Sequence, residues 1–380
     1  SVRNAARVGP LLGDVRLLRA LLSRARASMR IYLYDWPSNA SHFHRGIKQD
    51  GYKMEQSYWQ RLSASAWRTH VPTRDALKLV PFTLVGCHNE RLNPSLKGSR
   101  SNLRSIDDCA RQMRDIVGSL QFFGEQNGSD HVWLSAHDSG KMVGALADQR
   151  LLRNGVSLLN SADVSLKADL PLVFDPARDV SVVPCVCAAP KTIILPPAAR
   201  HLLAYFVGSI SGKPVRQALK KGVEAFRRSE ASREAKPVQF FTSGVHNYDD
   251  GLRDAVFCLC PVGNAVWSPR LIRAMLQGCI PVVIADGYWM PFSCFFDWRR
   301  FTVFVPEARA GETAHILASI SIAQATAMQT ELLRVRQHFA FQPGRSPSAE
   351  PDAFELTMLE LFMKTHSGAC TSTMRDPCSA

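Results

Sequence analysis

The most constraining feature of this 380-residue chain is one uninterrupted segment, residues 256–306. It reads VFCLCPVGNAVWSPRLIRAMLQGCIPVVIADGYWMPFSCFFDWRRFTVFVP. This order of residues predicts a buried strand, a glycine-containing loop, a short helix, a second buried strand and an aromatic-rich turn. Apolar strands that alternate with helices are typical of a parallel sheet covered on both faces. The segment therefore predicts an α/β fold, in which ligands bind beyond the carboxyl ends of the strands.

The helix within this segment has sequence signals at both ends. Ser268 followed by Pro269 is typical of an N-cap next to a first helical residue. Gly278 supplies the left-handed residue that ends the helix. The apolar strand that follows ends at Asp286, whose carboxylate is a candidate either for binding ligand hydroxyls or for capping the next turn.

Two arginines share one face of the predicted helix. Arg270 and Arg273 are three residues apart and lie near the positive end of the helix dipole. Two cations at that end disfavour the helix unless an anion binds there. The alternative is that both arginines lie on a solvated face. An anion at this position would also meet backbone amides from the loop at Gly263 and from the helix start at Ser268.

The segment resembles the signature of the exostosin family, glycosyltransferase family 47. Five motifs of the family have counterparts in this chain. They are F-C-L-x-P-x-G at Phe257–Gly263, S-x-R at Ser268–Arg270, G-C-I-P-V at Gly278–Val282, L-P-F at Met290–Phe292 and D-W at Asp297–Trp298. The match covers about fifty contiguous residues without a gap and is specific. Weaker similarities extend it over most of the chain, at residues 31–37, 68–82, 131–138, 179–184 and 204–216.

The resemblance implies a GT-B architecture, in which two Rossmann-like domains face one another across a cleft. Strands that alternate with helices in both halves of the chain agree with it. A proline-rich region before residue 198 reads as the linker. We expect a stem or N-terminal helix at 1–28, an acceptor domain at 29–197, a nucleotide-sugar domain at 198–345, and a C-terminal helix with a mobile tail at 346–380.

Family members transfer a sugar with inversion from a nucleotide diphosphate donor. The resemblance therefore implies a UDP-sugar as donor, a glycan or polysaccharide as acceptor, and no metal cofactor. Such a displacement needs a base for the acceptor hydroxyl and cations or amides for the leaving diphosphate. The donor-binding candidates are Gly208, Lys213, Arg216, Gly263, Ser268, Arg270, Arg273 and Asp286. For Lys213 and Arg216 the alternative is that they solvate a helix start.

The candidates for the base are His137 and Asp138. They end a predicted strand, residues 131–136, of the acceptor half, which is where open α/β sheets place their ligands. The alternative is a structural role, in which Asp138 caps the next helix and His137 is a buried, hydrogen-bonded imidazole.

Arg273 departs from the family pattern. The family usually has Glu at this position, and in glycosyltransferases of this two-domain type that acid hydrogen-bonds the nucleotide ribose. A guanidinium only donates hydrogen bonds and cannot replace it. Either Arg273 contacts the diphosphate, or the chain is a catalytically weak paralogue that binds glycan or a partner glycosyltransferase.

The net charge of +13 raises the question of nucleic acid as a partner. The basic residues are spread thinly and no nucleic-acid motif accompanies them, so an anionic nucleotide sugar or glycan is the better partner for a basic groove. A dehydrogenase or epimerase is disfavoured because residues 34–37, which follow the first strand, carry no G-x-G-x-x-G turn.

Ten cysteines are many for a cytosolic protein. The C-x-C pairs at 185–187 and 258–260 lack the spacing of zinc sites. We expect Cys258, Cys260 and Cys279 to be buried thiols. In an oxidising compartment, the candidates for disulfides are Cys87 with Cys109, or Cys370 with Cys378.

Two sequons, at Asn39 and Asn127, are compatible with the secretory pathway. No apolar run reaches the eighteen residues that a membrane span needs. Because family members resemble type II Golgi proteins and this sequence begins at Ser1, we expect a protein of the Golgi lumen, anchored by an N-terminal span that precedes these residues.

Overall fold

The computed structural model describes residues 15–35, 52–82, 106–138, 140, 152–165, 174–186, 193–342 and 350–367. The first 14 residues, the sequon at Asn39 and the expected tail after residue 367 lie outside this range. The chain divides into two compact units. The first comprises residues 1–185, 289–294 and 341–372, and the second comprises residues 186–288, 295–340 and 373–380.

The first unit is built on a sheet of parallel strands in the order β2-β1-β3-β4-β5-β6. These strands are β1 (Ile31–Leu33), β2 (Arg68–Thr69), β3 (Leu77–Leu79), β4 (His131–Ser135), β5 (Val156–Leu159) and β6 (Val180–Ser181). Its helices are α1 (Val15–Ser28), α2 (Met54–Ser63), α4 (Ile106–Ser119) and α12 (Ala353–Phe362), and a π-turn, η10 (Met363–Ser367), follows α12.

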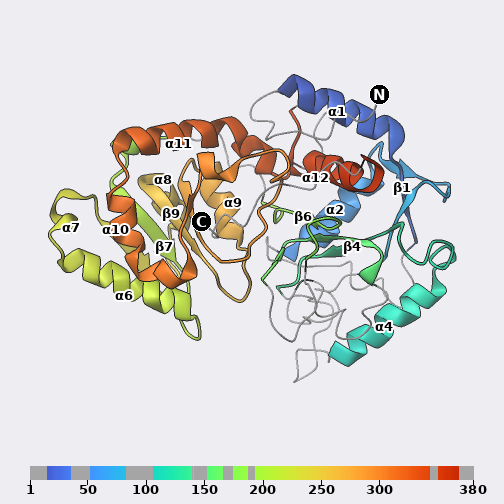
Figure 1. Ribbon diagram of the computed structural model, residues 1–380, viewed down its shortest axis with the longest axis horizontal. Helices are drawn as coiled ribbons and strands as arrows, with labels where there is room; N and C mark the ends of the chain where they lie inside the picture. The colour runs from blue at the N-terminus through green and yellow to red at the C-terminus, as the bar shows by residue number, and fades with distance from the viewer. Residues whose placement is uncertain are drawn as a thin grey trace. The chain divides into compact units, whose positions relative to one another are not determined.

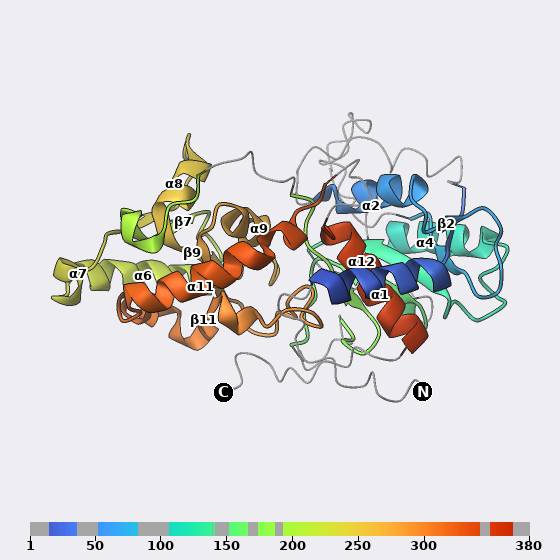
Figure 2. The ribbon, with the colours of Figure 1, turned by 90° about the horizontal axis from the view of Figure 1, so that it is seen from above.

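The helix α12 is apolar on nearly every side. Its residues Phe354, Leu356, Leu359 and Leu361 are all fully buried, as expected for a helix packed within a core. The amphipathic helix α1 lies beside it in both views of the ribbon (Figures 1 and 2). The helix α12, far from the other helices of this unit in the sequence, thus completes its core.

The second unit has a sheet of parallel strands in the order β11-β10-β9-β7-β8. These are β7 (Leu202–Val207), β8 (Val238–Phe241), β9 (Ala255–Pro261), β10 (Ile280–Ile284) and β11 (Val303–Phe304). The helices are α6 (Pro214–Arg228), α7 (Ala231–Glu234), α8 (Tyr248–Asp254), α9 (Pro269–Leu276), α10 (Thr313–Ala318) and α11 (Ile322–Val335). Short 3-10 turns are η6 (Pro197–Ala199), η7 (Trp298–Arg300), η8 (Glu307–Glu312) and η9 (Arg336–Phe339).

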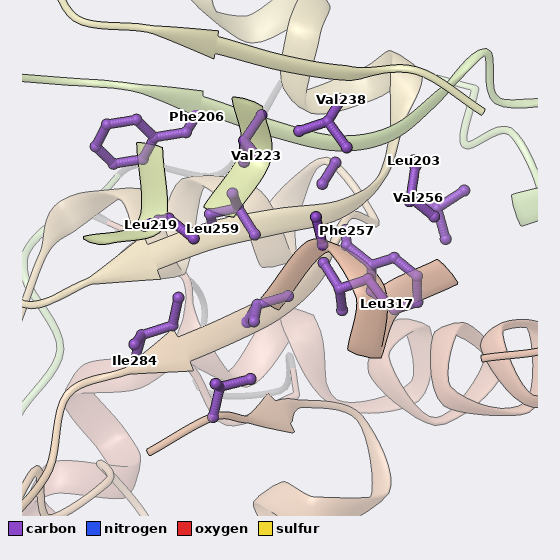
Figure 3. Close-up of a cluster of buried hydrophobic side chains, with 14 of the residues drawn as sticks. Leu203, Phe206, Leu219, Val223, Val238, Val256, Phe257, Leu259, Ile284 and Leu317 are labelled. Atoms are coloured by element: carbon purple, nitrogen blue, oxygen red, sulfur yellow. The ribbon is translucent and has the colours of Figure 1, made fainter. Parts of the chain in front are cut away.

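Helices cover both faces of this second sheet. On one face Phe206 and Leu259 pack with Leu219 and Val223 of α6 and Leu317 of α10 (Figure 3). On the other face, α8 and α9 pack against the alternate residues of β7 and β9. Figure 2 shows α8 and α6 on opposite sides of β7. The predicted α/β class is confirmed in both units.

One sequence expectation about cysteines is wrong. Cys258 of β9 and Cys279, which precedes β10, form a disulfide with their Cα atoms 5.8 Å apart. Only Cys260 of the three is a buried free thiol, and burial raises its pKa to about 11. Cys109 and Cys294 each take part in a disulfide as well. Cys87, Cys370 and Cys378 lie outside the described residues.

Within the described residues, every helix is too short or too polar to span a bilayer.

The Cys258–Cys279 disulfide closes a loop with a sequence separation of 21 residues. A crosslink over such a loop stabilises the fold by about 3 kcal/mol, largely by restricting the unfolded chain. Replacing both cysteines by alanine should therefore lower Tm by several degrees in a thermal melt. The matched control is Cys260→Ala, which removes a buried thiol from the same strand without breaking the crosslink. A double variant that melts no lower than this control would contradict the disulfide.

Candidate functional site

The strand order of the second unit creates a natural binding position at β7 and β9. The chain leaves β7 toward β8 on one side and continues from β9 toward β10 on the other. In an open parallel sheet such a switch point leaves a crevice beyond the carboxyl ends of the two strands. Gly208 directly follows β7, and the loop that contains Gly263 follows β9. These two sequence candidates therefore lie at the same edge of the sheet.

Two arginine side chains converge on this crevice, Arg216 from α6 and Arg270 from α9. A Cβ atom placed on Gly208 would lie 3.0 Å from Arg270 Nη2 and 3.5 Å from Arg216 Nη1. A Cβ on Gly263 would collide with Arg216 Nη2. Both guanidiniums also lie over the buried ring of Phe206, with Cζ 5.7 Å and 4.7 Å from its centroid for Arg216 and Arg270, respectively. Glycine at both positions leaves room for the two side chains.

Backbone carbonyls hold the two guanidiniums in place. Arg216 donates to Val262 O at 3.0 Å and to Ser209 O at 2.9 Å. Arg270 donates from Nη2 to Val207 O at 2.7 Å. The side chain of Arg270 also hydrogen-bonds that of Tyr248, while its Nε and Nη1 atoms are buried and have no acceptor among the described residues. These bonds fix the geometry of the side chains and leave donors available.

The positive charge of this pair is not balanced by a carboxylate within the described part of the chain. Burial, and then the neighbouring charge of Arg270, lowers the pKa of Arg216 to about 10. Arg216 remains protonated at neutral pH, so the two like charges repel. A bound anion would relieve this repulsion, since charge-assisted hydrogen bonds to guanidinium are among the strongest in proteins.

The start of α9 lies at the same edge of the sheet, but its first amides are already used, since Pro269 has no N–H and the N–H of Leu271 donates to Ser268 O at 3.1 Å. Ser268 is the N-cap in extended conformation (φ −155°), and its hydroxyl accepts from the N–H of Arg270 at 3.3 Å. Pro269 is the first helical residue and Gly278 ends the helix with φ +66°, so both predicted helix ends are confirmed. Lys213, which caps α6, donates to Asn264 in the loop after β9.

Arg273 and Asp286 do not join this cluster. Arg273 donates to Asp249 of α8 at 2.8 Å and lies over the ring of Tyr248, 4.7 Å from its centroid. Asp286 accepts from the N–H of Glu307 at 3.1 Å, and its own N–H donates to the Glu307 carboxylate at 2.9 Å. Asp286 is thus held by the first residue of η8, and no hydrogen bond from its carboxylate to the next turn is seen among the described residues.

In the first unit, His137 and Asp138 follow β4 and are both partly buried. Asp138 is hydrogen-bonded to the hydroxyl of Tyr52. Burial, and then the charge of Asp138, raises the pKa of Tyr52 well above its usual value, so Tyr52 stays protonated and donates. Glu55 of α2 accepts from the N–H of Ala136 at 2.8 Å.

Glu55 is a residue that sequence reasoning missed. It is only 1% exposed, which is rare for a carboxylate. A signal was present, because Glu55 falls in the stripe formed with Tyr58, Trp59 and Leu62 at helical spacing. An acid inside an otherwise apolar stripe marks a buried carboxylate, and here it lies next to the two candidate bases.

The described residues contain no group of three or more His, Cys, Asp or Glu side chains placed to hold a metal ion. The charges in the crevice come from guanidinium groups instead.

Residues 25–320 match the model of the exostosin GT47 domain. A probable glycosyltransferase of Arabidopsis thaliana is 27% identical over 94% of this chain and 66% of its own length. A probable glucuronoxylan glucuronosyltransferase of the same plant is 29% identical over 80% of this chain and 66% of its own length. A probable glucuronosyltransferase of Oryza sativa subsp. japonica is 26% identical over 89% of this chain and 80% of its own length. The chain thus spans about two thirds of the length of the first of these relatives.

Among solved structures, Acinetobacter baumannii MurG is similar with a TM-score of 0.38 and 11% identity, over 88% of this chain and 99% of that one. A TM-score this low carries no argument, so the fold class rests on the strand order of the two sheets.

The crevice predicts binding of inorganic pyrophosphate to the full chain. Arg216→Ala and Arg270→Ala should each weaken it roughly 10- to 100-fold, because each removes charge-assisted hydrogen bonds of about 1.5–3 kcal/mol. Isothermal titration calorimetry measures the affinity, and circular dichroism verifies the fold. The matched control is Arg309→Ala, which removes an exposed arginine paired with Glu312. Equal affinity in all three folded variants would show that the pair is no anion site.

Proposed function

Since the chain belongs to the exostosin GT47 family, we propose that it is an inverting glycosyltransferase that moves a sugar from a UDP-sugar to a glycan acceptor. The observation that carries the proposal is the pair of guanidiniums at the switch point, held side by side without a counter-charge in the described part of the chain. A nucleotide diphosphate supplies the missing negative charge. Relatives named glucuronosyltransferases make nucleotide-activated uronic acid a donor to test.

In this mechanism the second unit stabilises the leaving diphosphate. Arg216 and Arg270 face its oxygens, and the positive end of the α9 dipole lies at the same edge of the sheet, with a sign that favours an anion. Lys213 adds a further cation at the rim. Negative charge grows on the diphosphate as the glycosidic bond breaks, so donors that are already in place lower the barrier. The residues of this chain supply that charge without a bound metal.

The base that accepts the proton of the acceptor hydroxyl is assigned to the carboxyl end of β4. Asp138 is our first candidate and His137 the alternative. The hydrogen bond from Tyr52 holds the Asp138 carboxylate in place, as a base must be held relative to the proton that it accepts. Glu55 acts as a positioning residue, because its carboxylate holds the backbone N–H of Ala136 directly before this pair.

Arg273 fits an active enzyme in this proposal. Its guanidinium is engaged by Asp249 and Tyr248 and so leaves the diphosphate to Arg216 and Arg270. No observation on the described residues favours the alternative, a weak paralogue that binds glycan or a partner glycosyltransferase. The ion pair with Asp249 gives Arg273 a structural role that requires neither a bound glycan nor a partner glycosyltransferase.

We also propose that the protein works in the Golgi lumen, with a membrane anchor N-terminal to these residues. Support comes from the Cys258–Cys279 disulfide inside the second unit, because disulfides persist in oxidising compartments and are rare in the cytosol. A partner nucleic acid is not part of the proposal.

Turnover of a panel of UDP-sugars, including UDP-glucuronic acid, tests the function. The wild type should hydrolyse or transfer at least one donor. Arg270→Ala should lower kcat/KM by roughly 100-fold or more, as expected when a donor to developing charge is removed. Asp138→Asn should lower kcat while the KM for the donor stays within about twofold, because the base acts on the acceptor.

The variant Arg273→Glu distinguishes the proposed active glycosyltransferase from a catalytically weak paralogue. It places a carboxylate next to Asp249, so an active wild type should lose donor affinity or stability. A wild type that is inert with every donor, together with turnover gained by Arg273→Glu, would refute the proposed function of this chain.

A further inference from the structure

A second hollow lies in the same unit, between β8 and α8. It is a groove of about 510 Å³ with a floor formed by Tyr205 and Gly251. Gln239 and Phe241 of β8 line one wall. None of the donor-binding candidates lines it, so it is distinct from the arginine crevice. Its volume falls in the range of ligand pockets, which is about 300–1,000 Å³.

The opposite wall of the groove is formed by polar side chains along one side of α8 and the residue before it. Asn247, Asp250 and Asp254 line it, and their spacing of three and four residues places them on a common face. Their amide and carboxylate oxygens are hydrogen-bond acceptors, and Asn247 also donates. The groove therefore offers a line of groups that suit hydroxyls.

The groove also offers an aromatic surface. Phe241 is 38% exposed, although a large apolar side chain on an edge strand is an aggregation risk unless something covers it. Its ring lies edge-on to Tyr205, with centroids 6.2 Å apart. Gly251 allows this floor, since a Cβ there would collide with the ring of Tyr205. The flat apolar faces of sugar rings pack on such aromatic surfaces.

The charge of the groove sets its ligand class. No Lys or Arg lines it, in a chain with a net charge of +13, so phosphates and uronic acids find no cation there. Its carboxylates are already paired, Asp254 with His201 at 2.6 Å and Asp250 with Arg253. Arg253 balances the charge of Asp250, but His201 balances the charge of Asp254 only when its imidazole is protonated. The surface is therefore aromatic, rich in acceptors and weakly acidic, which disfavours anionic ligands.

We propose that this groove binds a neutral stretch of a glycan, apart from the site where the sugar is transferred. The inference rests on the proposed function, because the ligand is a part of the acceptor. A groove of this kind would hold a polymeric acceptor while its reacting end lies elsewhere. It would lower the KM for long acceptors and leave the donor step unchanged.

Calorimetry with neutral hexasaccharides of β-linked xylose and of β-linked glucose tests the groove on the full chain. We expect binding of at least one, and a loss of tenfold or more in affinity for Phe241→Ala and for Asn247→Ala. Both side chains are exposed, so the fold should be retained. Ile322→Ala, which removes another exposed apolar side chain (46% exposed), is the matched control and should bind as the wild type does.

Three outcomes overturn the inference: no binding of either hexasaccharide, binding that both groove variants retain, or binding of oligolysine at the groove in place of the saccharides. Donor hydrolysis by the same variants keeps the two proposals apart. Hydrolysis of a UDP-sugar without saccharide binding refutes only the proposal that the groove binds glycan. Saccharide binding that depends on Phe241, without hydrolysis of any UDP-sugar, refutes the proposed function and leaves a glycan-binding groove.

Discussion

The repulsion between two guanidinium groups is the constraint on which the second unit depends. Arg216 and Arg270 are held side by side at the carboxyl edge of the sheet, over the ring of Phe206 and against backbone carbonyls. Keeping like charges this close lowers the stability of the empty protein. The glycines at 208 and 263 leave the space that such a pair needs. An arrangement that is unfavourable when empty and favourable with a diphosphate is typical of a binding site.

The rest of the unit holds this pair rigid. Another arginine, Arg200, is only 1% exposed and donates to the carbonyls of Leu252, Ala255 and Gln277. It therefore satisfies the carboxyl ends of α8 and α9, which burial would otherwise leave unpaired. The Cys258–Cys279 disulfide joins β9 to the residue before β10 on the same face. These hydrogen bonds and this disulfide lie beneath α9, the helix that carries Arg270.

Local patterns in the sequence were sufficient for the parts of the site that depend on neighbouring residues. The cap at Ser268, the helix end at Gly278 and the strand before Asp286 follow from residue types a few positions apart. The clustering of Arg216 with Arg270 follows from topology, because both strands that precede them end at one edge. The α/β class followed from alternation alone.

Contacts between elements that are distant in the sequence could not be predicted from such local patterns. Helical spacing grouped Arg273 with Arg270, but Asp249 from α8 holds it elsewhere. Cys258 and Cys279 were expected to be separate buried thiols, whereas the structure joins them in a disulfide. Asp286 exchanges hydrogen bonds with Glu307, twenty-one positions away in sequence. In each case tertiary packing decides which side chain becomes the partner. Residue patterns in a single sequence do not show which distant side chains packing brings together.

The most direct measurement of the central claim is a crystal structure of this chain with UDP bound. Both phosphates should lie within hydrogen-bond distance of the guanidiniums of Arg216 and Arg270. A complex in which UDP lies away from these two side chains, with the crevice empty or filled by protein atoms, would contradict it.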